Sequence, residues 1–372
     1  MPAFIPGLSL SRAFFHEAVA PIINQDYPGL SYSAALIGSG SEVLGYDTEV
    51  STDHHWGPRV MLFLRPADHA RHAPALRDLL SHRLPYQFAG YSTHFGLPKV
   101  GGGDDGTQIP ERIDSGPVNH RVEIMTIDGY LRAHIGISAG ISAEQPLSAA
   151  DWLSVPQQKL LSLNAGEVFR DDLDLAALRA RLAWYPHDVW LYLLACGWSR
   201  IGQDEHLAPR AAMVGDELGA ALIAGRLVRS IMQLCFLMAR RYAPYAKWFG
   251  SAFAELPCAS ELIPALRGVQ VAKDDEDRQA ALCEAYESLN RQHNALGLTQ
   301  AIEPALLPFH NRGFQVSAAW RYCEALIQRI GDDQLRAAAA RAPIGSIDQF
   351  SDNTDLREAA HLRRKIAGLY QR

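Results

Sequence analysis

A glycine–serine pair and a carboxylate are spaced so that together they could hold a phosphate and a cation. Gly40 and Ser41 follow one short apolar run, and Asp53 precedes another. A Gly-Ser turn at the end of a strand lets backbone N–H groups approach a phosphate, because glycine has no Cβ and serine adds a hydroxyl. A carboxylate at the start of the next strand could then hold a divalent cation against the same phosphates.

Two predicted strands position these residues. The apolar runs 34–37 and 60–64 are typical of buried strands. Helices are predicted over 10–24, which has one apolar face, and over 68–83, which has a charged outer face. The predicted order around the turn is therefore strand, Gly/Ser turn with a short helix, acidic turn and strand.

A third predicted strand, over 121–127, carries a carboxylate in an otherwise apolar run. This residue is Glu123, and burying a carboxylate is costly unless it is paired or bound to a metal. An ion pair with Arg121 or Arg59 would satisfy it, and so would a cation shared with Asp53. Because of the upstream turn, we favour the metal site.

The string GSEVLGYDTEVSTDHHWGPR, residues 40–59, resembles the signature of the nucleotidyltransferase-fold superfamily, the polymerase-beta-like enzymes. Within it, the stretch GYDTEVSTDHHWGPR, residues 45–59, is similar to a bacterial family of that superfamily known mainly as a domain of unknown function. The superfamily motifs cover the N-terminal third of the chain. The resemblance to the smaller family extends through residues 242–250 and 348–350.

The resemblance implies a reaction and a role for each matching residue. Gly40 and Ser41 would hold the β and γ phosphates of ATP or another nucleoside triphosphate. Asp53, His55 and Glu123 would ligate Mg²⁺ or Mn²⁺. An acceptor on a small molecule or a protein would attack the α-phosphorus and receive a nucleoside monophosphate, AMP in the first instance.

His55 departs from the superfamily pattern, in which a second carboxylate usually stands at this position. Imidazole suits Zn, Mn or Fe better than Mg²⁺. Asp47 and Glu49 are alternative sources of oxygen ligands. Two other functions stay open: a catalytically degenerate nucleotide-binding or regulatory protein of the same fold, and a metal hydrolase using His54, His55 and a carboxylate. The hydrolase is weakened because adjacent strand residues point to opposite faces.

Composition shifts from mixed to helical patterns near residue 147. We predict an α/β (α+β) architecture: a nucleotidyltransferase-like domain over 1–147, with a mixed sheet and flanking helices, and an all-helical bundle over 148–372. The apolar stretch 209–241 is predicted to be one long helix at the spine of that bundle.

Two positions in the helical half could contribute to a nucleotidyltransferase site. Glu217 or Asp216 could act as the general base for the acceptor, although a carboxylate on a helix surface is an equal alternative. Lys247, which lies among aromatic residues, could contact phosphate and base, and a structural role is the alternative.

Composition limits the partners. The chain has 372 residues, 48% of them hydrophobic, and a formal net charge of -6, which argues against a nucleic-acid partner. Five scattered cysteines, the lack of a signal-peptide pattern, and apolar stretches at 189–198 and 231–239 too short to span a bilayer predict a cytoplasmic protein without membrane association. The Gly-rich segment 101–106 is predicted to be a surface loop. The resemblance leaves a homodimer open.

Overall fold

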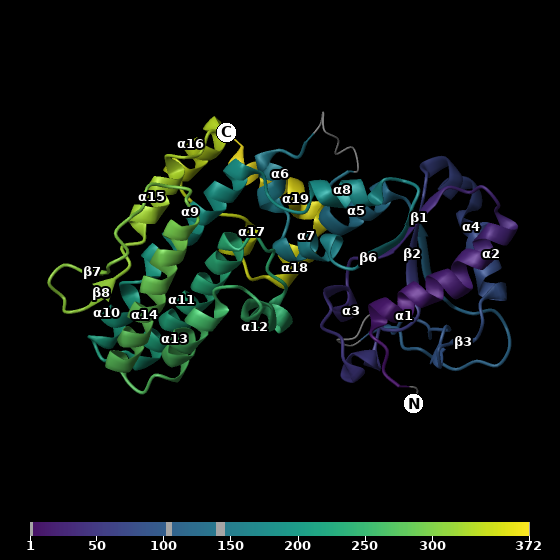
Figure 1. Ribbon diagram of the computed structural model, residues 1–372, viewed down its shortest axis with the longest axis horizontal. Helices are drawn as coiled ribbons and strands as arrows, with labels where there is room; N and C mark the ends of the chain where they lie inside the picture. Colours follow the sequence, from purple (N-terminus) through teal and green to yellow (C-terminus); the bar gives the residue numbers. More distant parts are fainter. Residues whose placement is uncertain (1–2, 102–105, 139–145, 372) are drawn as a thin grey trace. The chain divides into compact units, whose positions relative to one another are not determined.

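The computed structural model describes residues 3–101, 106–138 and 146–371. The chain forms two compact units (Figure 1). The first contains Met1–Pro146 and Lys159–Ala183, and the second contains Leu147–Gln158 and Trp184–Arg372. The sequence predicted a single boundary at residue 147. In the structure the chain crosses into the second unit near that residue, returns to the first unit for Lys159–Ala183, and then enters the second unit again. The predicted Gly-rich loop lies largely outside the described residues.

A four-stranded mixed sheet forms the centre of the first unit. Its order is β5-β2-β1-β6, in which β1 pairs antiparallel with β2 and β6, and β2 pairs parallel with β5. The strands are β1 (Tyr32–Leu36), β2 (Arg59–Leu64), β5 (Arg121–Met125) and β6 (Glu167–Asp171). The mixed sheet and flanking helices confirm the α/β architecture predicted for this part of the chain.

Helices cover the sheet and connect its strands. They are α1 (Gly7–Phe14), a π-helical turn η1 (Phe15–Val19), α2 (Ala20–Asp26), α3 (Ser41–Leu44), a 3₁₀ turn η2 (Glu49–Asp53), α4 (Pro66–Arg83), α5 (Ile127–Ile135), α7 (Gln157–Asn164) and α8 (Leu175–Arg181). The first two residues of α7, Gln157 and Gln158, belong to the second unit. A small hairpin pairs β3 (Gln87–Phe88) with β4 (Tyr91–Ser92). The helices predicted over 10–24 and 68–83 correspond to the α1–α2 segment and to α4.

The two faces of the sheet differ in chemistry. Alternate strand residues such as Ala34, Leu62 and Val122 join side chains of α1, η1, α2 and α4 in one apolar core, and Figure 1 shows these helices beside β1 and β2. Because side chains alternate along a strand, Met61 and its cross-strand partner Glu123 point to the opposite face. The polar residues of β2 and β5 are thereby gathered on one side.

Strand β6 is the strand of the central sheet that the sequence did not predict. It lies in a part of the chain expected to be helical, and it joins the edge of the sheet through β1, with a register shift between Ala34 and Ala35. The turn that leads into it depends on Gly166. That residue has φ +71°, and a Cβ there would lie 2.0 Å from the carbonyl oxygen of Leu36.

We predict that Gly166→Ala destabilises the first unit far more than Gly116→Ala. Both glycines have positive φ, so both substitutions carry backbone strain of about 1–3 kcal/mol. At Gly116 the new Cβ meets open space, whereas at Gly166 it collides with backbone that cannot rotate away. Urea unfolding of the two variants measures the difference, and equal midpoints would contradict it.

The second unit is mainly helical. Its elements are α6 (Ala149–Ser154), α9 (His187–Asp204), α10 (Leu207–Ala212), α11 (Glu217–Met238), α12 (Ala246–Ala254), α13 (Ala259–Val271), α14 (Asp275–Ala295), α15 (Trp320–Ile327), α16 (Asp333–Arg341), α17 (Ile347–Phe350), α18 (Thr354–Glu358) and α19 (Arg363–Ala367), with 3₁₀ turns η3 (Ala360–Leu362) and η4 (Gly368–Tyr370). One short hairpin, β7 (Leu307–Pro308) with β8 (Gln315–Val316), interrupts the helices.

The stretch predicted as one helix over 209–241 is two helices. Gly215 has φ +79°, and the side chain of Asp216 accepts a hydrogen bond from the N–H of Gly219 at 2.8 Å. The carboxylate thus caps the new helix α11. By length and composition α11 is the one helix, within the described part of the chain, that could cross a membrane. Since 56% of its apolar window is buried, it also fits the core helix of a globular unit.

His293 is buried in the second unit and has a structural role. The indole N–H of Trp198 donates to its Nδ1 at 3.1 Å, and its Nε2 lies 3.1 Å from the hydroxyl of Thr299. Burial lowers the pKa of His293 to about 4. His293 therefore belongs to the core of the second unit.

We predict that the second unit loses stability as the pH falls from about 6.5 to about 4. In this window the unfolded chain binds a proton at residue 293 and the folded chain does not, so acid favours unfolding by up to roughly 3 kcal/mol. Chemical unfolding at several pH values should show a flatter profile for His293→Gln. The exposed His361→Gln is the control and should keep the wild-type slope. Equal slopes in all three proteins would contradict the assignment.

Candidate functional site

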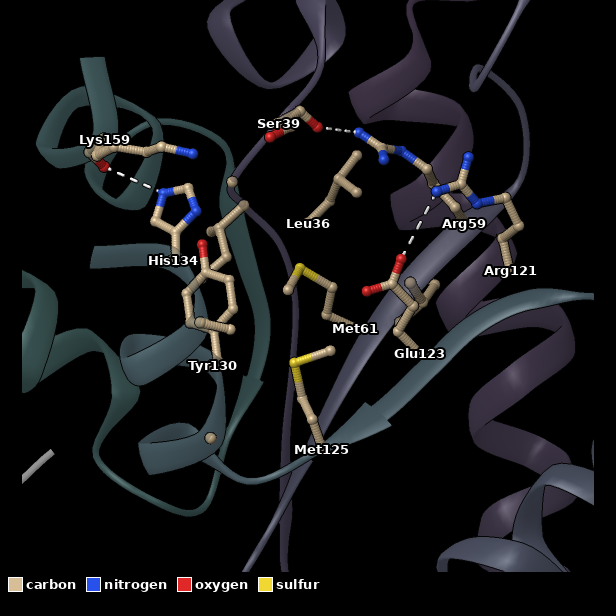
Figure 2. A pocket seen from close by; sticks show the side chains of 15 residues that line it. Leu36, Ser39, Arg59, Met61, Arg121, Glu123, Met125, Tyr130, His134 and Lys159 are labelled. Carbon is tan, nitrogen blue, oxygen red and sulfur yellow. Dashed lines mark hydrogen bonds and ion pairs between the residues drawn. The ribbon is translucent and has the colours of Figure 1, made fainter. Parts of the chain in front are cut away.

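A cavity of about 480 Å³ opens in the first unit on the polar face of the sheet. Figure 2 shows its side chains converging from β2, β5, α5 and the start of α7. Its lining consists of the turn after β1, both arginines of the paired strands, and one helical face: Leu36, Ile37, Gly38, Ser39, Arg59, Val60, Met61, Arg121, Glu123, Met125, Gly129, Tyr130, Ala133, His134 and Lys159. The strand register explains this gathering, because Arg59 pairs with Arg121 and Met61 with Glu123.

The glycine–serine pair that reaches the cavity is Gly38-Ser39, and not the predicted Gly40-Ser41. Gly38 has φ +84°, and a Cβ there would lie 2.9 Å from the hydroxyl of Tyr130. Gly40 precedes α3 with φ +138°, where a Cβ would lie 2.4 Å from Arg59. Positive φ favours glycine at both positions, and only Gly38 of the two lines the cavity.

A buried ion pair fixes the turn. Arg59 lies 2.5 Å from the carboxylate of Glu42, and it also donates to the carbonyl oxygen of Ser39 at 2.5 Å. The two side chains are 11% and 5% exposed, so the pair is shielded from water. The Nε of Arg59 is buried and has no hydrogen-bond partner among the described residues.

Arg121 faces the cavity between a histidine and a glutamate. It donates to the Nδ1 of His55 at 3.0 Å, and the nearest carboxylate oxygen, on Glu123, is 3.7 Å away. Burial, followed by the positive charges of Arg121, His54 and Arg59, lowers the pKa of His55. His55 is thus a neutral acceptor that orients the guanidinium, and its φ of +52° places it in a conformation that side chains rarely adopt.

Glu123 lies at the cavity and is 46% exposed, so it does not carry the full cost of burial that the sequence suggested. Its contact with Arg121 matches the ion-pair alternative.

Asp53 is 65% exposed, pairs with His54 at 2.7 Å and does not line the cavity. Among the residues that the structure describes, no three His, Cys, Asp or Glu side chains are grouped to hold a metal ion. Asp53, His55 and Glu123 therefore do not fit the predicted Mg²⁺ site.

Tyr130 and Lys159 complete the cavity. The ring of Tyr130 stacks on His134 with centroids 5.1 Å apart, while His134 bonds to the hydroxyl of Ser162 at 2.9 Å. The hydroxyl of Tyr130 is buried and has no partner among the described residues. Burial, and then the charge of Glu123, raise the pKa of this phenol. Figure 2 shows the ammonium of Lys159 on the same side of the cavity.

Asp47 has a structural role and does not supply the oxygen ligand considered above. Its carboxylate accepts hydrogen bonds from the backbone N–H of Gly7 at 2.7 Å and from the indole N–H of Trp56 at 3.0 Å. Trp56 is 2% exposed and stacks on Phe4. The acidic turn is thereby tied to the start of the chain, while Glu49 remains exposed.

The predicted site residues of the helical half lie in the second unit. Glu217 is 60% exposed and forms a 3.5 Å ion pair with Arg278. Asp216 caps α11. The ammonium of Lys247 lies 4.9 Å from the ring centroid of Trp248. These contacts correspond to the surface and structural alternatives considered for each residue.

Several residues that line the cavity were not predicted from the sequence. Gly38 and Ser39 precede the predicted turn in the repeated Gly-Ser-Gly-Ser segment, so their signal was visible but assigned two residues later. Arg121 was considered only as a partner for Glu123. Tyr130 and Lys159 lie on helices whose patterns gave no reason to single them out.

We predict that Asp47→Ala destabilises the first unit by about 2–3 kcal/mol and that Glu49→Ala changes stability by less than about 0.5 kcal/mol. Removing Asp47 leaves a buried indole N–H without an acceptor, whereas Glu49 is solvated. Urea unfolding followed by tryptophan fluorescence gives both values. If Asp47→Ala behaves like Glu49→Ala, the anchoring role is wrong.

Comparisons with known proteins give two resemblances. Residues 152–249 match a family described as a domain of unknown function, DUF4037, and this match covers less than half of the chain. No curated protein matches. The structure is similar to the crystal structure of a nucleotidyltransferase-like protein from Exiguobacterium sibiricum 255-15, with a TM-score of 0.33, 10% sequence identity and 82% of each chain covered. The chain is therefore similar to a family without an assigned function and, loosely, to a nucleotidyltransferase-like protein.

Proposed function

We propose that the cavity of the first unit binds a nucleoside triphosphate, ATP in the first instance, and that the protein transfers the nucleoside monophosphate to a small-molecule or protein acceptor. The observation that carries this proposal is the lining of the cavity, where the cations Arg121 and Lys159 lie with the Gly38-Ser39 turn. A cavity with a few convergent polar and charged groups is typical of a small-molecule site.

The charges of the cavity favour a ligand with several oxygen atoms. Arg121 and Lys159 bring two positive charges, and Glu123 brings one negative charge, because Arg59 is already compensated by Glu42. Arginine recognises phosphate oxygens through a planar set of donors. The narrow turn at Gly38 lets the backbone approach such a group closely.

In the proposed reaction the acceptor oxygen or nitrogen forms a bond to the α-phosphorus, and the bond from that phosphorus to the bridging oxygen breaks. Pyrophosphate leaves, and the proton of the acceptor passes to a base. Glu123 is the carboxylate that lines the cavity, and half of its surface is accessible to an acceptor. No step of this proposal is assigned to a metal ion, because the described residues do not form its ligand set.

A second function is favoured by the same lack of clustered carboxylates. A protein that binds the nucleotide through Arg121 and Lys159 but does not turn it over needs no such cluster. Its cavity would serve as a sensor or regulatory site. The two functions share the binding step and differ in pyrophosphate release.

We predict that Tyr130→Phe leaves thermal stability unchanged and weakens ATP binding three- to tenfold. Its hydroxyl has no partner among the described residues, so its removal should leave the stability of the unliganded protein unchanged. Arg121→Gln should weaken binding by at least tenfold. Arg132→Gln is the matched control, since it removes the same charge from an exposed position of the same unit. Titration calorimetry measures all four proteins.

Radiolabelled ATP, with and without Mg²⁺ or Mn²⁺ and with cell extract as the acceptor source, separates the functions. Pyrophosphate release supports transfer, and binding without release supports the regulatory function. Release of phosphate or AMP would support the hydrolase instead. Wild-type protein that binds no nucleotide, or an Arg121→Gln variant that binds like Arg132→Gln, would overturn the proposal.

A further inference from the structure

A second cavity, of about 240 Å³, lies within the second unit. Two segments singled out in the sequence, 242–250 and 348–350, meet there although about a hundred residues separate them. The cavity is lined by the start of α7, one side of α11, the start of α12 and the C-terminal segment: Gln157, Gln158, Arg229, Gln233, Ala243, Pro244, Ala246, Phe249, Asp348 and Arg357.

Gln157 is a buried polar residue with a spare donor. Its side-chain oxygen Oε1 accepts a hydrogen bond from the backbone N–H of Ala243 at 3.0 Å, which fixes the side chain. Its backbone N–H donates a hydrogen bond to the carboxylate of Asp348 at 2.8 Å. The residue is 4% exposed, and its side-chain NH₂ has no partner among the described residues. A fixed amide whose free end lines a cavity is a preorganised hydrogen-bond donor.

The acids near the cavity are already occupied. The carboxylate of Asp348, which is 4% exposed, accepts from the backbone of Gln157 and from Arg357. The Nε of Arg357 is buried without a partner in the described part of the chain. Arg229 pairs with Asp352, but this pair is largely solvent-exposed and therefore weak. The groups left for a ligand are consequently donors.

Helix α12 adds further donors at the edge of the cavity. It has nine residues, and its N-cap residue Tyr245 makes no side-chain hydrogen bond to the first turn. The first residue, Ala246, lines the cavity. Unsatisfied N–H groups and the helix dipole favour negative charge at such an end.

We propose that this cavity binds a small metabolite bearing an oxyanion, a carboxylate or a phosphate. Its oxygen atoms would accept from Gln157, from Arg229 and from the start of α12, and its apolar part would lie against Phe249. The volume is below the roughly 300–1,000 Å³ of sites for drug-sized ligands, so the ligand is smaller than a nucleotide. The site is separate from the nucleotide cavity and does not depend on the function proposed for it.

Titration of the full-length protein with malonate and with inorganic phosphate tests this site. We predict that the wild-type protein binds at least one of them and that Ala246→Glu weakens the binding at least tenfold. A glutamate in the first turn suits the helix itself, so the variant should fold normally, while its carboxylate repels the oxyanion. Ser251→Glu is the matched control, because it places the same charge at an exposed position of α12 outside the cavity.

The two probes distinguish the sources of the oxyanion. Binding of malonate alone indicates a carboxylate ligand, and binding of phosphate alone indicates a phosphorylated one. Arg121→Gln should leave malonate binding unchanged, which keeps this test independent of the nucleotide cavity. Failure of both probes to bind at 10 mM, a concentration about ten times a weak millimolar Kd, would overturn the proposal. Equal affinities of Ala246→Glu and Ser251→Glu would do the same.

Discussion

The buried ion pair between Arg59 and Glu42 is the interaction on which the first cavity depends. It joins the start of β2 to α3, and the same guanidinium holds the carbonyl oxygen of Ser39. Breaking a buried pair by removing one partner typically costs about 3–5 kcal/mol, because the remaining charge stays buried without compensation. A Cβ at Gly40 would lie 2.4 Å from the Arg59 guanidinium, so a side chain there would disturb the ion pair. The conformation of the turn, the ion pair and the rim of the cavity therefore depend on one another.

This constraint changes the meaning of the string at residues 40–59. Glu42, Asp47, Trp56 and Arg59 mainly hold the turn together and tie it to the start of the chain. The side chains that can address a ligand come mostly from outside the string, on β5, α5 and α7. A motif that resembles an enzyme signature can therefore report on the fold more directly than on the chemistry.

The elements with local patterns could be predicted, and those set by distant partners could not. Strands β1, β2 and β5 are apolar runs, and α4 has clear periodicity, so their existence follows from the residues. Strand β6 is amphipathic only in part, and it pairs with a strand far earlier in the chain. Whether Asp53 and Glu123 lie close together depends on the register of β2 and β5, which the sequence does not reveal. That register places Met61 opposite Glu123 and leaves Asp53 on an exposed turn ahead of β2.

His55 shows how one side chain changes the chemistry open to the site. A carboxylate at this position would form an ion pair with Arg121 and would cancel its charge. The imidazole is neutral, since burial and the neighbouring arginine lower its pKa, so it orients Arg121 without compensating it. Two unit charges about 4 Å apart near a protein surface interact by roughly 4 kcal/mol, and Glu123, which is 3.7 Å away, is the acid that already attracts Arg121. With imidazole at position 55, Arg121 keeps a single acidic neighbour, Glu123, and its charge is the one that the proposed phosphate ligand would use.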